Sequence, residues 1–413
     1  MPVNIDLVCV KCGREYTPKE VKYTCIKCGN DGLLDIFYDY NQIKKKIKKI
    51  NLKKNPDRSI ARYDFILPVK SKDLLPQIKV GGTPIIKSTR LNNFFNLKNL
   101  YIKDDTRNPT ASFKDRASAV AVAKAREFGY KTLTCASTGN AASSMAGMCA
   151  AQGLKAKIFV PKTAPEAKVA QLLIYGAEVF MVKGTYDEAF DFCLEVSKKY
   201  PWYNRNTGYN PYLLEGKKTC AMEICEQFDF NVPDKVIVSV GDGCIIGGIY
   251  KGFYDFYKLG WIDKIPQIIG VQAEGSSPLV KAFNGNRDVI PEKAETLADS
   301  ICVGHPRAAG QALKGVRNSK GFMVSVKDKE ILDAIKILAR QSGIFAEPAG
   351  AASIAGLKKL VKEKKIKQNE KVVVIITGHG LKDIKTALST VNAKPHIINP
   401  SMKELQKALK GKS

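Results

Sequence analysis

From residue 81 onward, short runs of β-branched and aromatic residues alternate with longer stretches of small apolar residues. Helical stretches are expected from Ala117, from Ala141 and near Ala167. The β-branched runs are LYIKDD, TLTCAS, AKIFVP, EVFMVK, KVIVSVG, QIIGVQAE and VVVIITG. This alternation is typical of βαβ units, in which helices cover both faces of a parallel sheet. The chain is therefore predicted to be an α/β protein with open parallel sheets.

The number of predicted strands is too large for one small sheet. A chain of 413 residues favours two or three folding units, and turn-forming residues collect between Pro211 and Asp234. We therefore expect two lobes with a cleft between them. The expected units are a small N-terminal unit (1–36), a lysine-rich connector with the first part of a large lobe (37–110), a mainly small lobe (111–234), and the rest of the large lobe with C-terminal helices (235–413).

Four of the 11 cysteines form two CxxCG motifs near the N-terminus. VCVKCG contains Cys9 and Cys12, and TCIKCG contains Cys25 and Cys28. Two tight turns of this kind present four thiolates to one tetrahedral ion, so residues 1–36 are predicted to form a zinc ribbon with structural Zn²⁺. Cysteines three residues apart are too close for ordinary disulfides, which indicates a reducing compartment. MPVNIDLVC does not resemble a signal peptide, so a cytoplasmic location is expected.

The formal charge of +26 comes mostly from lysines spread along the chain and is densest in residues 41–55 and near the C-terminus. Such runs are usually the solvated side of a helix or linker. A basic zinc-ribbon protein that binds nucleic acid is the non-enzyme alternative. The ribbon has few aromatic residues beyond Tyr16 and Tyr23, so no nucleic-acid partner is expected. No apolar run approaches the length needed to cross a bilayer, so no membrane partner is expected either.

Three predicted strands end in loops rich in Gly, Ser, Thr and Asn: 135–144, 239–248 and 375–383. Ligands of open parallel sheets bind at the carboxyl ends of strands. Lys114, in RNPTASFKDR, stands where a polar turn enters an apolar helix, a setting suited to a partly desolvated amine nucleophile. GDGCIIG also matches a dinucleotide-binding pattern with Glu274 as the ribose-binding acid, so NAD is a rival ligand.

The order of the motifs resembles that of the fold type II pyridoxal-phosphate (PLP) enzymes, whose lobes are similar to the tryptophan synthase β subunit. Within that family the chain looks most like the threonine synthases, many of which carry an N-terminal ribbon. The resemblance covers nearly the whole chain and rests on KVGGTP, NPTASFKDR, CASTGNAA, YNPYLLEGKKT, GIFAEPAGAAS and IITGHGLKD. It implies a homodimeric lyase of threonine biosynthesis that converts O-phospho-L-homoserine, a phosphorylated amino acid, and water into L-threonine and phosphate.

The resemblance also assigns roles to single residues. Lys114 matches the catalytic lysine that forms the Schiff base with the cofactor, and Asn140 matches the asparagine that hydrogen-bonds the ring hydroxyl. Ser137, Thr138 and Gly139 fall in the loop expected to bind the substrate carboxylate. A plain helix N-cap is the alternative for these loop residues.

The remaining cofactor contacts implied by the resemblance lie in the two later loops. Thr377 falls where the family places a hydroxyl against the pyridine nitrogen. A neutral hydroxyl leaves that nitrogen largely unprotonated, which suits elimination and replacement chemistry. His379 is either a proton carrier or a structural histidine. The phosphate cup falls on Gly241, Asp242, Gly243, Cys244 and Ile245.

Three departures from the usual threonine-synthase pattern leave the substrate open. Ala111 replaces a typical glycine, GDGCI replaces GNxGN, and Leu213 replaces an arginine that helps bind the substrate phosphate. Another cation could compensate, and the candidates are Arg307, Lys217 and Lys168. Alternatively, the substrate differs, as in a cysteate synthase-like replacement of phosphoserine by sulfite or in a threonine or serine dehydratase.

Overall fold

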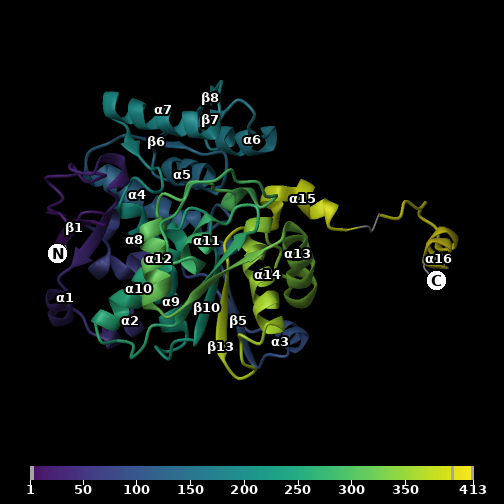
Figure 1. Cartoon of the computed structure of the whole chain (residues 1–413). Coiled ribbons are helices and arrows are strands. Elements are labelled where there is room, and N and C mark those ends of the chain that lie inside the picture. Colours follow the sequence, from purple (N-terminus) through teal and green to yellow (C-terminus); the bar gives the residue numbers. More distant parts are fainter. Residues whose placement is uncertain (1–3, 392–394, 411–413) are drawn as a thin grey trace.

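The computed structural model describes residues 4–391 and 395–410, and it contains three sheets. The first is a small antiparallel sheet at the N-terminus, in the order β2-β1-β3. It lies on the left in Figure 1. Its strands are β1 (Ile5–Cys9), β2 (Glu15–Tyr16) and β3 (Leu34–Tyr38).

The largest sheet has six strands in the order β12-β11-β10-β13-β5-β4. All neighbours are parallel except β4, which runs antiparallel to β5 at the edge. At its centre Val374 pairs with Ile237 on one side and with Ile102 on the other. The strands are β4 (Ile85–Ile86), β5 (Asn99–Asp104), β10 (Lys235–Ser239), β11 (Gln267–Ala273), β12 (Phe322–Val326) and β13 (Lys371–Ile376).

The third sheet has four parallel strands in the order β8-β7-β6-β9. It forms the upper part of the molecule in Figure 1, above the six-stranded sheet. The predicted α/β fold with parallel sheets is confirmed, although β4, β9 and β12 were not anticipated. The strands are β6 (Thr132–Ala136), β7 (Lys155–Pro161), β8 (Glu178–Val182) and β9 (Tyr203–Asn204).

Helices cover the two parallel sheets, and α16 stands away from the rest of the molecule (Figure 1). No helix in the described ranges is both long and apolar enough to cross a bilayer. The helices are α1 (Tyr40–Lys46), α2 (Lys49–Lys54), α3 (Thr89–Phe95), α4 (Lys114–Glu127), α5 (Asn140–Ala150), α6 (Glu166–Ile174), α7 (Tyr186–Lys199), α8 (Tyr212–Lys217), α9 (Thr219–Gln227), α10 (Cys244–Lys258), α11 (Pro278–Asn284), α12 (Ala309–Asn318), α13 (Asp328–Ser342), α14 (Pro348–Lys362), α15 (Ile384–Ser389) and α16 (Met402–Lys410).

Helix α4 is buried along nearly its whole length, which its alanine-rich sequence permits. Small side chains let neighbouring backbones come close, and a Cβ at Gly216 of α8 would lie 2.0 Å from the carbonyl oxygen of Arg116. The guanidinium of Arg116 is nevertheless buried and paired with Asp105 and Glu223, each at 2.6 Å. Glu223 also pairs with Lys103 at 2.7 Å. This ion cluster ties β5, α4 and α9 together behind the residues that begin α4.

Candidate functional site

A cavity of about 950 Å³ is lined by loops that follow strands of both parallel sheets. Strands β6, β10 and β13 each end at this cavity, as the sequence predicted, and α4 begins there. All predicted cofactor and substrate residues line its wall: Lys114, Ser137, Thr138, Gly139, Asn140, Gly241, Asp242, Gly243, Cys244, Ile245 and Thr377.

Lys114 is the first residue of α4 and faces this cavity. Its side chain keeps partial accessibility because the cavity opens beside it, but the surrounding protein excludes most bulk water. Burial, together with the neighbouring cations Lys217 and Arg205, lowers the pKa of Lys114 to about 8, against the opposing effect of Glu347. A substantial fraction of this amine is therefore neutral near physiological pH, as a base or nucleophile requires.

The turn before Lys114 contains a strained residue. Ala111 has φ of 59°, a left-handed conformation that L-residues other than glycine rarely adopt. Its amide donates to the carbonyl of Asn108 at 2.8 Å, and its own carbonyl accepts from the amide of His379 at 3.1 Å. The replacement of a typical glycine by Ala111 therefore falls at a position where glycine would be unstrained.

Asn140 begins α5 and is buried in the cavity wall. Its amide donates to the carboxylate of Glu347 at 2.7 Å and lies 3.4 Å from the hydroxyl of Ser300. Burial raises the pKa of Glu347, although Lys382 and Lys114 act in the opposite direction. Gly378 allows this approach, because a Cβ there would lie 2.2 Å from the Glu347 carboxylate.

The loop before Asn140 is short and internally bonded. The Ser137 hydroxyl accepts a hydrogen bond from the amide of Gly139 at 3.2 Å, and the amide of Ser137 donates to the carbonyl of Phe159 at 3.2 Å. Ser137, Thr138 and Gly139 keep partial exposure to the cavity. The loop thus offers hydroxyl and amide donors at the N-terminal end of α5, a place suited to a carboxylate.

The glycine loop after β10 turns into α10 through Gly243, whose φ is 94°. A Cβ at Gly243 would lie 2.9 Å from the carbonyl oxygen of Ala308, so the chain just before α12 packs closely against the glycine loop. The carboxylate of Asp242 accepts from the amide of Arg307 at 2.7 Å and from the thiol of Cys244 at 3.2 Å. The acid that replaces asparagine in the phosphate-cup pattern therefore anchors a neighbouring loop.

Thr377 follows β13 and places its hydroxyl 3.4 Å from that of Ser239, at the end of β10. Its carbonyl accepts from the amide of Phe113 at 2.8 Å. This bond fixes the residue next to Lys114 to the β13 loop. Two neutral hydroxyls are thus gathered at the carboxyl ends of the central strands, opposite α4.

Three residues on which the sequence left alternatives open lie outside the wall of this cavity: Glu274, His379 and Leu213. Glu274 is exposed and is not part of the cavity wall, which removes the ribose-binding acid of the NAD hypothesis. His379 accepts from the amide of Leu381 at 3.1 Å through Nδ1, as a structural histidine does. Leu213 is buried and lines a separate small hollow of about 20 Å³ beside the ribbon.

Sequence reasoning did not assign a role to several residues that share the cavity. Glu347 lies in the segment GIFAEPAGAAS, and its carboxylate directly before a proline and a run of small residues was the available signal. Ser239 and Ser300 carried no distinguishing pattern. Arg205 is buried and donates to the hydroxyls of Ser118 and Thr207 at 3.1 and 3.2 Å.

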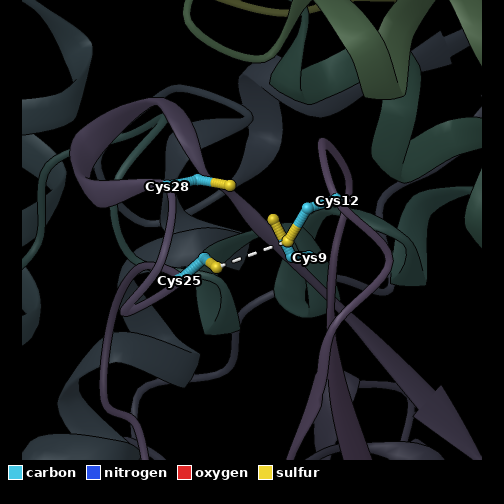
Figure 2. Close-up of side chains that lie close together, drawn as sticks. All are labelled: Cys9, Cys12, Cys25 and Cys28. Carbon is cyan, nitrogen blue, oxygen red and sulfur yellow. Dashed lines mark hydrogen bonds between the residues drawn. The ribbon is translucent and has the colours of Figure 1, made fainter.

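The four N-terminal cysteines converge as their spacing predicted. The sulfur atoms of Cys9, Cys12, Cys25 and Cys28 all lie within 4.8 Å of one another, and Figure 2 shows them pointing toward a common centre. The sulfur atoms of Cys12 and Cys25 are 3.7 Å apart, and the hydroxyl of Tyr16 lies 3.1 Å from the sulfur of Cys25. Four thiols at such spacing match the donor set of a tetrahedral structural zinc site.

The ribbon packs against the elements that form the cavity. Leu33, beside the cysteine cluster, makes a buried apolar group with Cys244 and Ala308. Tyr38 of β3 donates a hydrogen bond to Glu215 of α8. The glycine loop is therefore supported from behind by the ribbon.

Comparisons with known proteins agree with this geometry. Residues 77–378 match the family described as pyridoxal-phosphate dependent enzyme. Threonine synthase of Methanocaldococcus jannaschii is 43% identical over 97% of this chain and 98% of its own length. Threonine synthase of Methanosarcina acetivorans is also 43% identical, over 98% of this chain and 99% of its own.

Solved structures show the same fold at lower identity. Threonine deaminase isoform 2 from Solanum lycopersicum has a TM-score of 0.66 at 23% identity and covers 86% of this chain and 93% of its own. Maize serine racemase has a TM-score of 0.63 at 21% identity, with coverages of 80% and 92%. With relatives aligned along nearly the full length and the matched segment spanning both parallel sheets, this chain belongs to the pyridoxal-phosphate dependent enzymes, and within them to the threonine synthases.

Proposed function

We propose that this enzyme converts O-phospho-L-homoserine and water into L-threonine and phosphate. The observation that carries the proposal is the Lys114 amine, which faces a cavity lined by the residues that the family pattern implies. The near full-length likeness to proteins named threonine synthase supports the choice of reaction within the family. The substrate would be a small phosphorylated amino acid.

The residues of the cavity fit the cofactor by their chemistry. Lys114 supplies the amine that would hold the aldehyde group of PLP, and Asn140 supplies an amide for the ring hydroxyl. Thr377 supplies a neutral hydroxyl for the pyridine nitrogen, and the loop that ends at Ile245 supplies backbone amides for the phosphate. PLP, when bound, draws electrons away from the substrate carbons so that their protons become acidic.

The protein's own groups would then move protons and hold the substrate. The pKa of about 8 leaves Lys114 able to accept a proton and return it at neutral pH. One amine at the start of a rigid helix reaches successive carbons of a small substrate, so it can serve in turn at the α and β positions. The loop of Ser137, Thr138 and Gly139 would bind the carboxylate and fix the orientation.

The test is a product assay with O-phospho-L-homoserine, in which phosphate and threonine are measured together. We expect equal amounts of the two products, and Lys114→Ala should reduce the rate at least about 1,000-fold because the amine acts as nucleophile and base. Phosphoserine with sulfite, threonine and serine serve as comparison substrates. Phosphate release without threonine, or faster turnover of a comparison substrate, would refute the proposed reaction.

We also propose that Cys9, Cys12, Cys25 and Cys28 bind one structural Zn²⁺. The support is the convergence of four sulfur donors. Since a ribbon of about 35 residues has too small a core to fold alone, the ion would supply much of its stability. Elemental analysis of the purified protein should give one zinc per chain, and replacement of Cys25 by Ser should reduce that ratio.

The working form is proposed to be a cytoplasmic homodimer. This follows from the family pattern and from a thiolate ion site that a reducing compartment preserves. Light scattering on the purified protein should give twice the chain mass of 45.4 kDa. A monomeric mass in an active preparation would contradict the dimer.

A further inference from the structure

Lys217 is a buried cation beside the large cavity. It is the last residue of α8, its exposed fraction is 0%, and its Nζ has no hydrogen-bond partner among the residues that the structure describes. Its side chain lines the large cavity. A buried ammonium that makes no hydrogen bond is costly for a folded protein, so its presence in the cavity wall calls for a ligand that supplies the missing partner.

The groups nearest Lys217 are already bonded to one another. Burial lowers the pKa of Lys217, while the charges of Cys244 and Asp242 and a side-chain contact with the Cys244 thiol offset only part of this effect. The Asp242 carboxylate is already bonded to the amide of Arg307 and to the thiol of Cys244. Two further cations, Arg205 and Lys114, lie near enough to interact electrostatically with Lys217. This side of the cavity is therefore cationic and suited to an anion.

Lys217 is also packed against the helix whose start faces the cavity. A Cβ at Gly248, in the second turn of α10, would lie 2.7 Å from the Cβ of Lys217. Helix α10 runs from Cys244 to Lys258, and the amides of its first turn have no intrahelical acceptor. The helix end and the ammonium thus act on the same corner of the cavity.

We propose that Lys217 binds a phosphate monoester dianion at the N-terminal end of α10. The other cations named from the sequence already have partners. Lys168 pairs with Asp299, and the guanidinium of Arg307 lies 4.1 Å from the ring centre of Phe190. Leu213, where many threonine synthases carry an arginine, is on the same helix one turn earlier and faces a different hollow. Lys217 therefore offers the cavity wall a positive charge of the kind that this chain lacks at Leu213.

Two phosphates could occupy this corner, that of the cofactor and that of the substrate. That these are the two phosphates present rests on the proposed function, and the following experiment distinguishes binding of the cofactor phosphate from binding of the substrate phosphate. Apoprotein is titrated with PLP and with pyridoxal, which lacks the phosphate, and dissociation constants are obtained from absorbance. The variants are Lys217→Gln, Lys217→Arg, and the exposed control Lys264→Gln, which removes the same charge far from the cavity wall.

If the cofactor phosphate is bound, Lys217→Gln should weaken PLP binding at least about tenfold, because a charge-assisted bond is lost, and leave pyridoxal binding unchanged. If the substrate phosphate is bound, Lys217→Gln should leave PLP binding unchanged. The KM for O-phospho-L-homoserine should then rise by a similar factor, and inorganic phosphate should inhibit the variant less. Lys217→Arg should retain part of either effect. If Lys217→Gln changes neither the dissociation constant of PLP nor the KM for O-phospho-L-homoserine, the inference is overturned.

A measurement on unaltered apoprotein covers the case in which a variant does not fold. Inorganic phosphate should raise its melting temperature in a saturable way, and chloride at equal ionic strength should not. Lys217→Met should melt no lower than the unaltered apoprotein, since no hydrogen bond is lost, but should not respond to phosphate. Absence of the phosphate effect in the unaltered protein would also overturn the inference. An unaltered enzyme that responds to phosphate but makes no threonine would refute only the proposed reaction.

Discussion

At the scale of single residues, the cavity gathers side chains from the starts of α4 and α5 and from the loops that follow β10 and β13. The sequence could not predict their partners. The bond from Asn140 to Glu347 joins residues far apart in the chain, and it depends on how α5 and α14 meet. The isolation of Lys217 is likewise a property of packing, because the sequence EGKKT contains two lysines and only Lys218 finds acceptors, in Glu215 and Asp255.

Ala111 gives a stability prediction. Ala111→Gly should raise the free energy of unfolding by about 1 kcal/mol, because a left-handed alanine costs ~1–2 kcal/mol and the flexibility of glycine offsets part of the gain. Urea unfolding followed by circular dichroism measures it. Ala117→Gly, inside α4, is the matched control and should instead lower stability by about 1 kcal/mol. A loss of stability in Ala111→Gly would show that the alanine is not strained.

Glu347 gives a prediction about pH. Its negative charge raises the pKa of Lys114, so Glu347→Gln should lower that pKa further below about 8. The amide oxygen of glutamine can still accept the bond from Asn140. In the apoprotein, the pH at which acylation of Lys114 reaches half its maximal rate, followed by mass spectrometry, should move downward. An unchanged or higher midpoint would contradict the electrostatic role of Glu347, and Lys264→Gln controls for total charge.

At the scale of elements, the alternation of β-branched runs with small-residue stretches located the parallel strands that end at the cavity, because each run is short and is followed by a loop rich in Gly, Ser, Thr or Asn. It missed β4 and β9, which have two residues each and too little pattern to detect. It also missed β12, an edge strand whose apolar run FMVSV is interrupted by a serine. The strand order was not predictable, since pairing of β5 with β13 joins segments that are distant in the chain.

The ion cluster that joins β5, α4 and α9 should be sensitive to removal of its shared acid. Glu223→Gln leaves Arg116 and Lys103 incompletely neutralised in the core, so the free energy of unfolding should fall by about 3–5 kcal/mol. Urea unfolding at neutral pH measures this loss. Glu178→Gln, which removes a largely exposed partner of Lys157, should change stability by less than about 1 kcal/mol.

The same acid predicts a pH dependence. Burial alone would raise the pKa of Glu223, but Arg116 and Lys103 outweigh it and lower the pKa to about 2. A lowered carboxyl pKa contributes stability above its unfolded value and loses it as the pH falls through the folded value. The stability difference between the unaltered protein and Glu223→Gln should therefore shrink from about pH 4.5 toward pH 2. A difference independent of pH over this range would exclude ion pairing as its source.

At the scale of the whole molecule, the ribbon and the catalytic body are one packed unit, since Leu33 shares a buried group with Cys244 and Ala308. Treatment with a zinc chelator should therefore lower the melting temperature and also accelerate the release of PLP. The measurements are calorimetry and cofactor fluorescence, before and after chelation. Restoration by added zinc is the control. Unchanged cofactor release from a zinc-free protein that remains folded would show that the ribbon does not support the glycine loop.

The Leu33 contact lies between the cysteine cluster and the glycine loop, so the proposed Zn²⁺ and PLP sites should affect each other although they share no atom. If a zinc-loaded ribbon holds PLP, a form of vitamin B6, more tightly by some factor, then bound PLP must hold the zinc ion more tightly by the same factor. Enzyme that lacks its vitamin should therefore surrender the ion more readily to competing thiols. Shortage of one nutrient would then deplete the other from the same molecule.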